Sequence, residues 1–244
     1  MAITKVQQAT GNGATVALTS VAAGNLLTLH DSYFRAVSTG ASESAPTDTQ
    51  GTWSIASNGV PGIEVPLGYD CGSGIFYQAN VAAGTHTVTP QNNFAHNATL
   101  AEWSGVATST PFDVGANAKT NNSSFTSQVT GTTATTAQAD ELVLISLGLA
   151  APTGVANVGF TDPVTGFTTL QKISDDASDV GTFHAYKIVA ATGTQSATFN
   201  WTDSEANQFA GANIATFKAA AAASTELPLT IMAPLTPPGW PRLR

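Results

Sequence analysis

Residues Gly74 to Thr89 read GIFYQANVAAGTHTVT, and a related stretch, GTFHAYKIVAATGTQSAT, follows later as residues Gly181 to Thr198. The two copies align at a constant offset up to the turn, where the second copy has two additional residues. Each copy has an apolar segment with aromatic and β-branched residues, then a turn of small residues, then a second segment that begins and ends with threonine. This pattern is typical of two strands joined by a turn. The sequence therefore predicts a β-protein that contains two related halves.

Further segments recur in the same order. The apolar run Leu26 to His30 returns as Leu142 to Ser146, and Leu100 to Ser104 returns as Ile214 to Lys218. Short apolar runs bounded by turn residues are typical of strands that are buried on both faces. No segment shows a sustained helical period with caps, so helix is expected to be minor. The fold class that follows is all-β, an antiparallel jelly-roll-like β-sandwich.

The domain organisation follows from the repeat. We predict one β-sandwich over residues 1–218, with pseudo-repeated halves at about 20–106 and 137–218; two separate sandwich domains are the alternative. Residues 111–138 lie between the halves and are rich in Thr, Asn and Ser. They form either a linker between the halves or a strand that crosses from one half to the other. A strand is favoured, because each half has about five strands and the strands of the other half can cover its sheet edges.

The composition changes abruptly at residue 219. Residues 219–244 contain five of the twelve prolines of the chain, and proline keeps a segment extended and out of a sheet interior. We predict an extended C-terminal arm that docks on a neighbouring subunit or partner; packing back on its own sandwich is the alternative. The apolar side chains expected to make this contact are Leu227, Leu229, Ile231, Met232, Leu235, Trp240 and Leu243.

Charge excludes some classes of partner. Charged residues make up 10% of the chain, the formal net charge is −8, and the eight Lys and Arg residues are scattered along the sequence. Nucleic-acid binding is therefore not expected, because phosphate binding needs clustered basic residues.

The apolar runs are too short to cross a bilayer. The first residues lack the apolar region of a secretory signal, so we expect synthesis in the cytoplasm without a signal peptide.

Catalytic and metal-binding motifs are weak. The four histidines show no close metal-ligand spacing, so neither a metal nor another cofactor is predicted. Ser104 precedes a glycine but lacks the leading glycine of a nucleophile elbow. Asp175, Asp176 and Asp179 fit a solvated turn better than a calcium loop. A glycoside hydrolase or lyase would need converging carboxylates, and the sequence gives no reason to pair any two of Glu64, Asp70, Glu102 and Asp113. We therefore predict no catalytic residues and no enzyme activity.

A long loop is expected over residues Asn58 to Gly72, with two prolines and no counterpart of equal length in the second half. Long loops in compact domains commonly carry function, although covering a sandwich end is the simpler interpretation. Most aromatic residues occupy matched strand positions that suit a core. Tyr69 is the aromatic residue expected to be exposed, so Tyr69 and Asp70 are the candidate glycan-binding residues.

Four motifs carry a resemblance to known proteins: AGNLL from Ala23, AEWSGV from Ala101, ADELV from Ala139 and ATFK from Ala215. They resemble jelly-roll or concanavalin-like β-sandwich proteins encoded by tailed bacteriophages and bacteria. In that group a tyrosine is more frequent where Trp103 stands. The resemblance implies the sandwich fold and brings no catalytic residues with it.

The function expected from these points is structural. We expect a virion protein of a tailed bacteriophage, a capsid-decoration, spike or fibre-attachment protein anchored through its C-terminal arm. Its partners would be other virion proteins or neighbouring copies in a homo-oligomer, and its location the virion. The alternative is a carbohydrate-binding module that recognises host or environmental glycans through the loop Asn58 to Gly72, with Tyr69 and Asp70.

Overall fold

The computed structural model describes residues 2–35, 40–59, 61–64, 68–91, 95–151, 158–162, 164–174, 180–202 and 206–221. All regular secondary structure in these residues is β-strand, and the strands pair in antiparallel sheets. The predicted all-β fold class is thus confirmed. No helix in this part of the chain is long and apolar enough to span a membrane.

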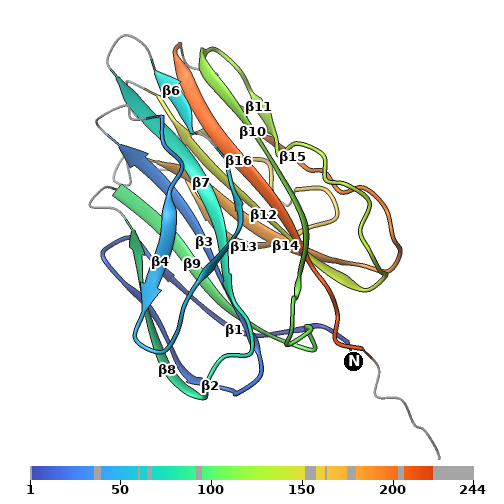
Figure 1. The fold of residues 1–244 in the computed structure, drawn as a ribbon. Helices are drawn as coiled ribbons and strands as arrows, with labels where there is room; N and C mark the ends of the chain where they lie inside the picture. Colours follow the sequence, from blue (N-terminus) through green and yellow to red (C-terminus); the bar gives the residue numbers. More distant parts are fainter. Residues whose placement is uncertain are drawn as a thin grey trace, which may run out of the picture.

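Two large sheets form the centre of the molecule (Figure 1). The first large sheet has the order β1 (Thr4–Gly11), β9 (Ala95–Ser104), β3 (Leu26–Arg35), β7 (Tyr69–Gln78) and β5 (Ser54–Asn58), and β6 (Gly62–Glu64) also pairs with β7. The second has the order β10 (Phe112–Ser123), β16 (Gln208–Phe217), β12 (Glu141–Ala150), β14 (Gly181–Val189) and β13 (Thr168–Ile173). Both paths arrange five strands as first, fifth, second, fourth and third along the chain. The two sheets therefore share one topology.

Two smaller sheets cover the outer faces of the large ones. One consists of β2 (Val16–Val21), β8 (Gly84–Gln91) and β4 (Ser44–Asp48), and the other of β11 (Ser127–Val129) and β15 (Thr198–Asn200). Figure 1 shows β4 and β8 on one side of the stack and β11 and β15 on the other. Apolar clusters fill the spaces between the successive layers.

The central strands β3 and β12 are buried on both faces. Leu26 of β3 packs between the two large sheets, whereas Leu27 packs toward the three-stranded sheet. In β12, Leu144 packs between the large sheets and Ile145 packs toward the outer layer on the other side. Successive side chains of a strand point to opposite faces, so a strand covered on both sides needs a continuous apolar run. The prediction for these two runs is confirmed.

The layer between the large sheets changes character along the strands. At one end large apolar side chains meet, among them Trp103 and Phe217. In the middle of the strands the facing side chains become small and polar and the backbones approach closely, and at the other end a second apolar cluster forms around Cys71, Ala150 and Phe209. A Cβ atom added to Gly148 of β12 would lie 2.1 Å from the carbonyl oxygen of Gly72 on β7. Across this contact the Ser73 hydroxyl donates to the Ser146 carbonyl oxygen at 3.1 Å.

The favoured strand prediction for residues 111–138 agrees with the structure, whereas the loop prediction for residues 58–72 does not. Residues 111–138 contain β10 and β11, so the strand alternative describes them better than a linker. The expected loop at residues 58–72 contains β6 and the start of β7. The division into one domain of residues 1–218, with halves at about 20–106 and 137–218, stays a prediction. The topology that the two large sheets share also includes β1 and β10, which lie before the respective halves in the sequence.

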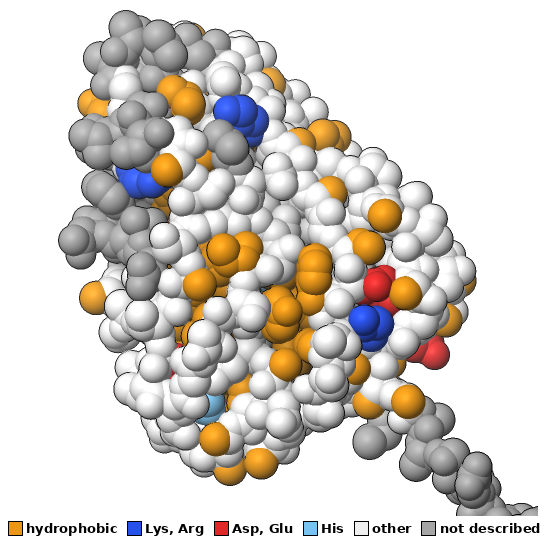
Figure 2. Space-filling model, viewed as in Figure 1, with side chains coloured by type: hydrophobic (Ala, Val, Ile, Leu, Met, Phe, Trp, Pro, Cys, Tyr) orange, Lys and Arg blue, Asp and Glu red, His pale blue; other side chains and the backbone are white. Residues whose placement is uncertain are grey.

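Uncharged side chains dominate the visible surface. Figure 2 shows one face on which polar uncharged groups and backbone predominate, charged side chains are few, and apolar side chains gather near the centre. This surface agrees with the low share of charged residues in the sequence. Many Ser, Thr and Asn side chains are also buried.

Candidate functional site

Tyr69 and Asp70 are strand residues, so the prediction that they lie in an exposed loop is wrong. They begin β7, which pairs there with β3 and β6. The Tyr69 ring is half-buried, with its centroid 5.4 Å from that of Phe34. Asp70 is fully buried, and one of its oxygens lies 2.6 Å from Arg35 Nε. A role for Tyr69 and Asp70 in glycan binding stays a prediction.

The apolar arm residues lie outside the described residues; they are Leu227, Leu229, Ile231, Met232, Leu235, Trp240 and Leu243. The acidic triplet Asp175, Asp176 and Asp179 also lies outside them. The start of the arm is described. Ala219 forms a β-bridge with Val106, and the Ala220 amide donates to the Gly105 carbonyl oxygen at 2.8 Å. The arm therefore begins at a fixed point beside the end of β9.

Glu102, one of the carboxylates considered for glycoside cleavage, has a structural role. Its Oε1 atom accepts hydrogen bonds from the Ala22 amide at 2.8 Å and from Asn25 Nδ2 at 2.6 Å. Its Oε2 atom accepts one from Gln7 Nε2 at 2.6 Å. This fully buried carboxylate therefore ties β1 and the turn before β3 to β9.

His184 on β14 lies in a hydrogen-bonded chain between the large sheets. Its Nε2 atom is 2.8 Å from Ser32 Oγ, and its Nδ1 atom is 2.9 Å from Thr99 Oγ1. A neutral imidazole offers one donor and one acceptor, so His184 donates to at most one of these two hydroxyls. Burial, together with the neighbouring His30, lowers the pKa of His184 well below its usual value. This hydrogen-bonded chain therefore contains His184 in its neutral form.

His30 is the second histidine of this layer. Its ring centroid lies 5.3 Å from that of His184, and neither of its ring nitrogens has a hydrogen-bond partner of good geometry. Burial lowers the pKa of His30 to about 4, and the nearby Ile145 backbone opposes this slightly. His30 is therefore also neutral at physiological pH.

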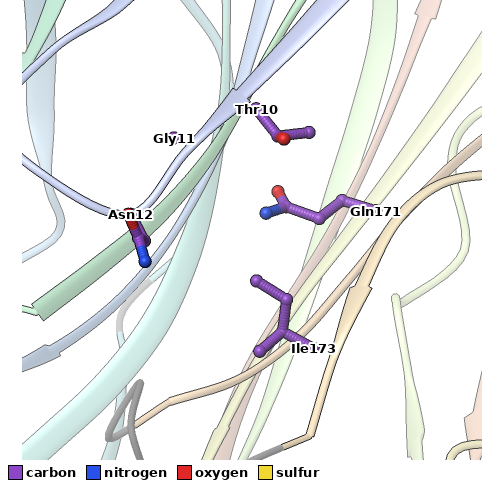
Figure 3. Close-up of a pocket in the computed structure, with 5 residues that line it drawn as sticks. All are labelled: Thr10, Gly11, Asn12, Gln171 and Ile173. Atoms are coloured by element: carbon purple, nitrogen blue, oxygen red, sulfur yellow. The ribbon is translucent and has the colours of Figure 1, made fainter.

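A small pocket opens where β1 and β13 face each other (Figure 3). It has a volume of about 230 Å³ and is lined by Thr10, Gly11, Asn12, Gln171 and Ile173. Figure 3 shows the Gln171 amide pointing into this space. The Gln171 Oε1 atom lies 2.7 Å from Thr99 Oγ1. Since Thr99 also contacts His184, polar contacts run from the pocket into the buried layer.

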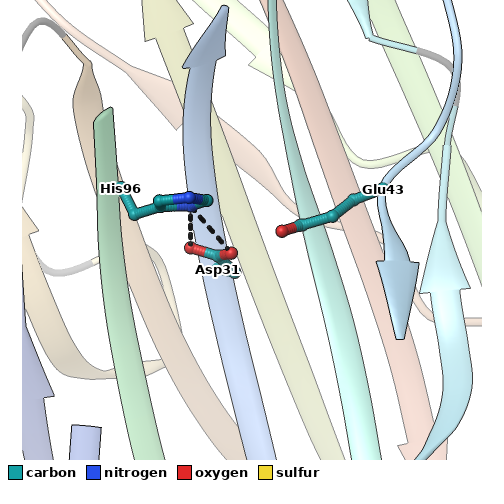
Figure 4. Close-up of side chains that lie close together, drawn as sticks. All are labelled: Asp31, Glu43 and His96. Carbon is teal, nitrogen blue, oxygen red and sulfur yellow. Dashed lines mark hydrogen bonds and ion pairs between the residues drawn. The ribbon is translucent and has the colours of Figure 1, made fainter. Parts of the chain in front are cut away.

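Three side chains that suit metal binding meet on the opposite face of β3 (Figure 4). The His96 Nδ1 atom on β9 lies 3.1 and 3.3 Å from the two carboxylate oxygens of Asp31 on β3. Glu43, directly before β4, points its carboxylate toward Asp31. One ligand atom from each residue lies within 4.8 Å of the other two, and all three residues are buried. The sequence analysis missed this cluster because its members are far apart in the chain.

The sequence matches no protein-family model and no curated protein. The resemblance to jelly-roll proteins of phages and bacteria therefore stays a prediction.

Proposed function

We propose that the protein is a structural component of a tailed-phage virion, held in a larger assembly through residues 219–244. The supporting observation is the use of buried polar groups. The pair Arg35–Asp70, the carboxylate of Glu102 and the ring of His184 each connect strands or layers of the fold. Arg35–Asp70 and Glu102 join elements of the first large sheet, and His184 joins this sheet to the second.

The start of the arm supports an anchoring role. Ala219 and Ala220 pair with the end of the first half, so the apolar sequence that follows is tethered at a defined place on the body. Burial of apolar surface contributes roughly 25 cal/mol per Å² before entropic costs. An arm with seven large apolar side chains has enough apolar surface for a stable contact with a neighbouring copy or another virion protein.

The test compares the full chain with a chain that ends at Ala221, by size-exclusion chromatography with light scattering. This end point keeps the β-bridge of Ala219 and the hydrogen bond of Ala220, so that the fold of the β-sheets is preserved. We expect the full chain to be a homo-oligomer and the shortened chain to be a folded monomer. The same oligomer in both would contradict the proposal, and a monomeric full chain would rule out docking of the arm on a neighbouring copy.

Point variants separate a specific contact from general stickiness. Leu229→Asp with Leu235→Asp places two charges in the expected contact and should abolish the oligomer. Thr230→Asp with Thr236→Asp adds the same charges to the same segment and should leave it intact. Equal effects of the two pairs would show that charge alone, and not apolar docking, controls assembly.

A further inference from the structure

We propose that Asp31, Glu43 and His96 form a binding site for one divalent transition-metal ion of the Zn²⁺ or Mn²⁺ type. The three residues come from three elements: β3, the segment before β4, and β9. The ion would therefore connect the first large sheet to the three-stranded sheet that covers it. This site is independent of the arm and of the proposed assembly.

The geometry is close to that of a coordinated ion. Metal–ligand distances for imidazole nitrogen and carboxylate oxygen are about 2.0–2.2 Å, so two ligand atoms of one ion are at most about 4.4 Å apart. The three ligand atoms here all lie within 4.8 Å of one another. Side-chain movements of a few tenths of an ångström, on the order of 0.4 Å, bring all three into range.

The surroundings position Glu43 for this role. The Arg35 guanidinium, bound to Asp70, donates a hydrogen bond to the Ala41 carbonyl oxygen. The segment just before Glu43 is thereby attached to β3. On β7, Gly74 lies opposite Asp31, and a Cβ atom there would be 3.4 Å from Glu43 Oε2 and 2.6 Å from the Phe76 ring. The glycine leaves room for the carboxylate.

Charge also favours a divalent cation. The buried guanidinium of Arg35 lies against Asp70, and the His96 ring lies against Asp31. Asp31 and Glu43 bring two further carboxylates into the same buried region. Buried charges are costly unless they are compensated. One divalent cation, bound by two carboxylates and a neutral His96, makes the cluster electrically neutral.

The ligand set selects the class of metal. Imidazole nitrogen suits Zn²⁺ and other transition metals, whereas Ca²⁺ and Mg²⁺ prefer sites made of oxygen. Ala41 and Ser42, directly before Glu43, are exposed, so the segment that carries Glu43 borders on solvent.

The test is calorimetric titration of the full, untagged chain, first dialysed against EDTA and then freed of it, with Zn²⁺, Mn²⁺ and Ca²⁺ in separate runs. We expect saturable binding of one Zn²⁺ or Mn²⁺ per chain and weaker binding of Ca²⁺. Glu43→Gln should weaken binding at least about tenfold, since loss even of groups that only support a ligand costs 10–100-fold. Absence of saturable binding by either transition metal, or tighter binding of Ca²⁺, would overturn the proposal.

The chain offers a matched control. His86 Nδ1 lies 2.6 Å from Asp48 Oδ2, a buried histidine–carboxylate pair outside the cluster. His86→Gln should leave the affinity unchanged, whereas equal affinities for wild type and Glu43→Gln would refute the assignment.

A second measurement needs no variant. Long-range ¹H–¹⁵N NMR of the wild-type chain reports on each of the four histidine rings. Saturation with Zn²⁺ should shift the Nδ1 signal of His96 and leave His86 unchanged. A shift at another histidine in place of His96 would contradict the site even if Glu43→Gln fails to fold.

Discussion

Acid should destabilise this protein through His30, and the size of the effect follows from its burial. The ring is fully buried between the large sheets, and its pKa is lowered to about 4. An unfolded histidine has a pKa of about 6.5. Between these two values the unfolded chain binds a proton that the folded chain excludes, so stability is retained above pH 6.5 and falls as the pH drops toward 4.

The expected loss can be worked out from the two pKa values. At pH 5.0 the unfolded histidine is almost fully protonated and the folded one almost fully neutral. Linkage then gives a decrease in the free energy of unfolding of about 2 kcal/mol between pH 7.5 and pH 5.0 for His30 alone. His184, whose pKa is lowered by burial and by His30, adds to this loss.

The variant His30→Leu isolates the effect. The native ring makes no hydrogen bond of good geometry, so its replacement by a side chain of similar volume should change the stability at pH 7.5 by less than about 1.5 kcal/mol. Urea unfolding followed by tryptophan fluorescence, with EDTA present to remove metals, gives the free energy at both pH values. The drop from pH 7.5 to 5.0 should be about 2 kcal/mol smaller in the variant. An equal drop in both proteins would refute the reasoning, because all other titrating groups are shared.

Two further substitutions test the packing by the same unfolding assay. Gly148→Ala places a methyl group 2.1 Å from a backbone oxygen of the other large sheet and should lower the free energy of unfolding by about 1–3 kcal/mol. The control Gly13→Ala, with nothing within 4 Å of its new Cβ, should change the free energy of unfolding by no more than about 0.5 kcal/mol. Asp70→Asn leaves the buried Arg35 charge uncompensated and should cost about 3–5 kcal/mol. If Gly148→Ala matched Gly13→Ala, the close contact would be wrong, and a cost below 1 kcal/mol for Asp70→Asn would exclude a structural ion pair.

The sequence predicts the strands that are determined locally. Leu26 to His30 and Leu142 to Ser146 are apolar runs between turn signals, and both became central strands buried on two faces. The repeated stretch from Gly74 likewise contains the end of β7 and the start of β8. These segments carry their own signal because strand burial and turn chemistry are encoded within a few neighbouring residues.

Features that depend on partners distant in sequence could not be predicted. Tyr69 and Asp70 look like loop residues, with prolines just before them, and only pairing with β3 and β6 makes them part of a strand. The cluster of Asp31, Glu43 and His96 forms where three elements meet, and no spacing rule connects its members. A weak signal was present, since Asp31 directly follows the apolar run Leu26 to His30 and is the acidic residue of the same strand.

The glycine contact between the large sheets has a mechanical consequence. Side chains on a strand repeat every two residues, about 6.6–6.8 Å along its axis. If one sheet slid over the other by one such step, the place of Gly148 against Gly72 would be taken by a residue with a side chain, and the bond from Ser73 to the Ser146 carbonyl would break. This contact therefore opposes sliding of one large sheet over the other. A force applied to the first large sheet is transmitted through the contact to the second.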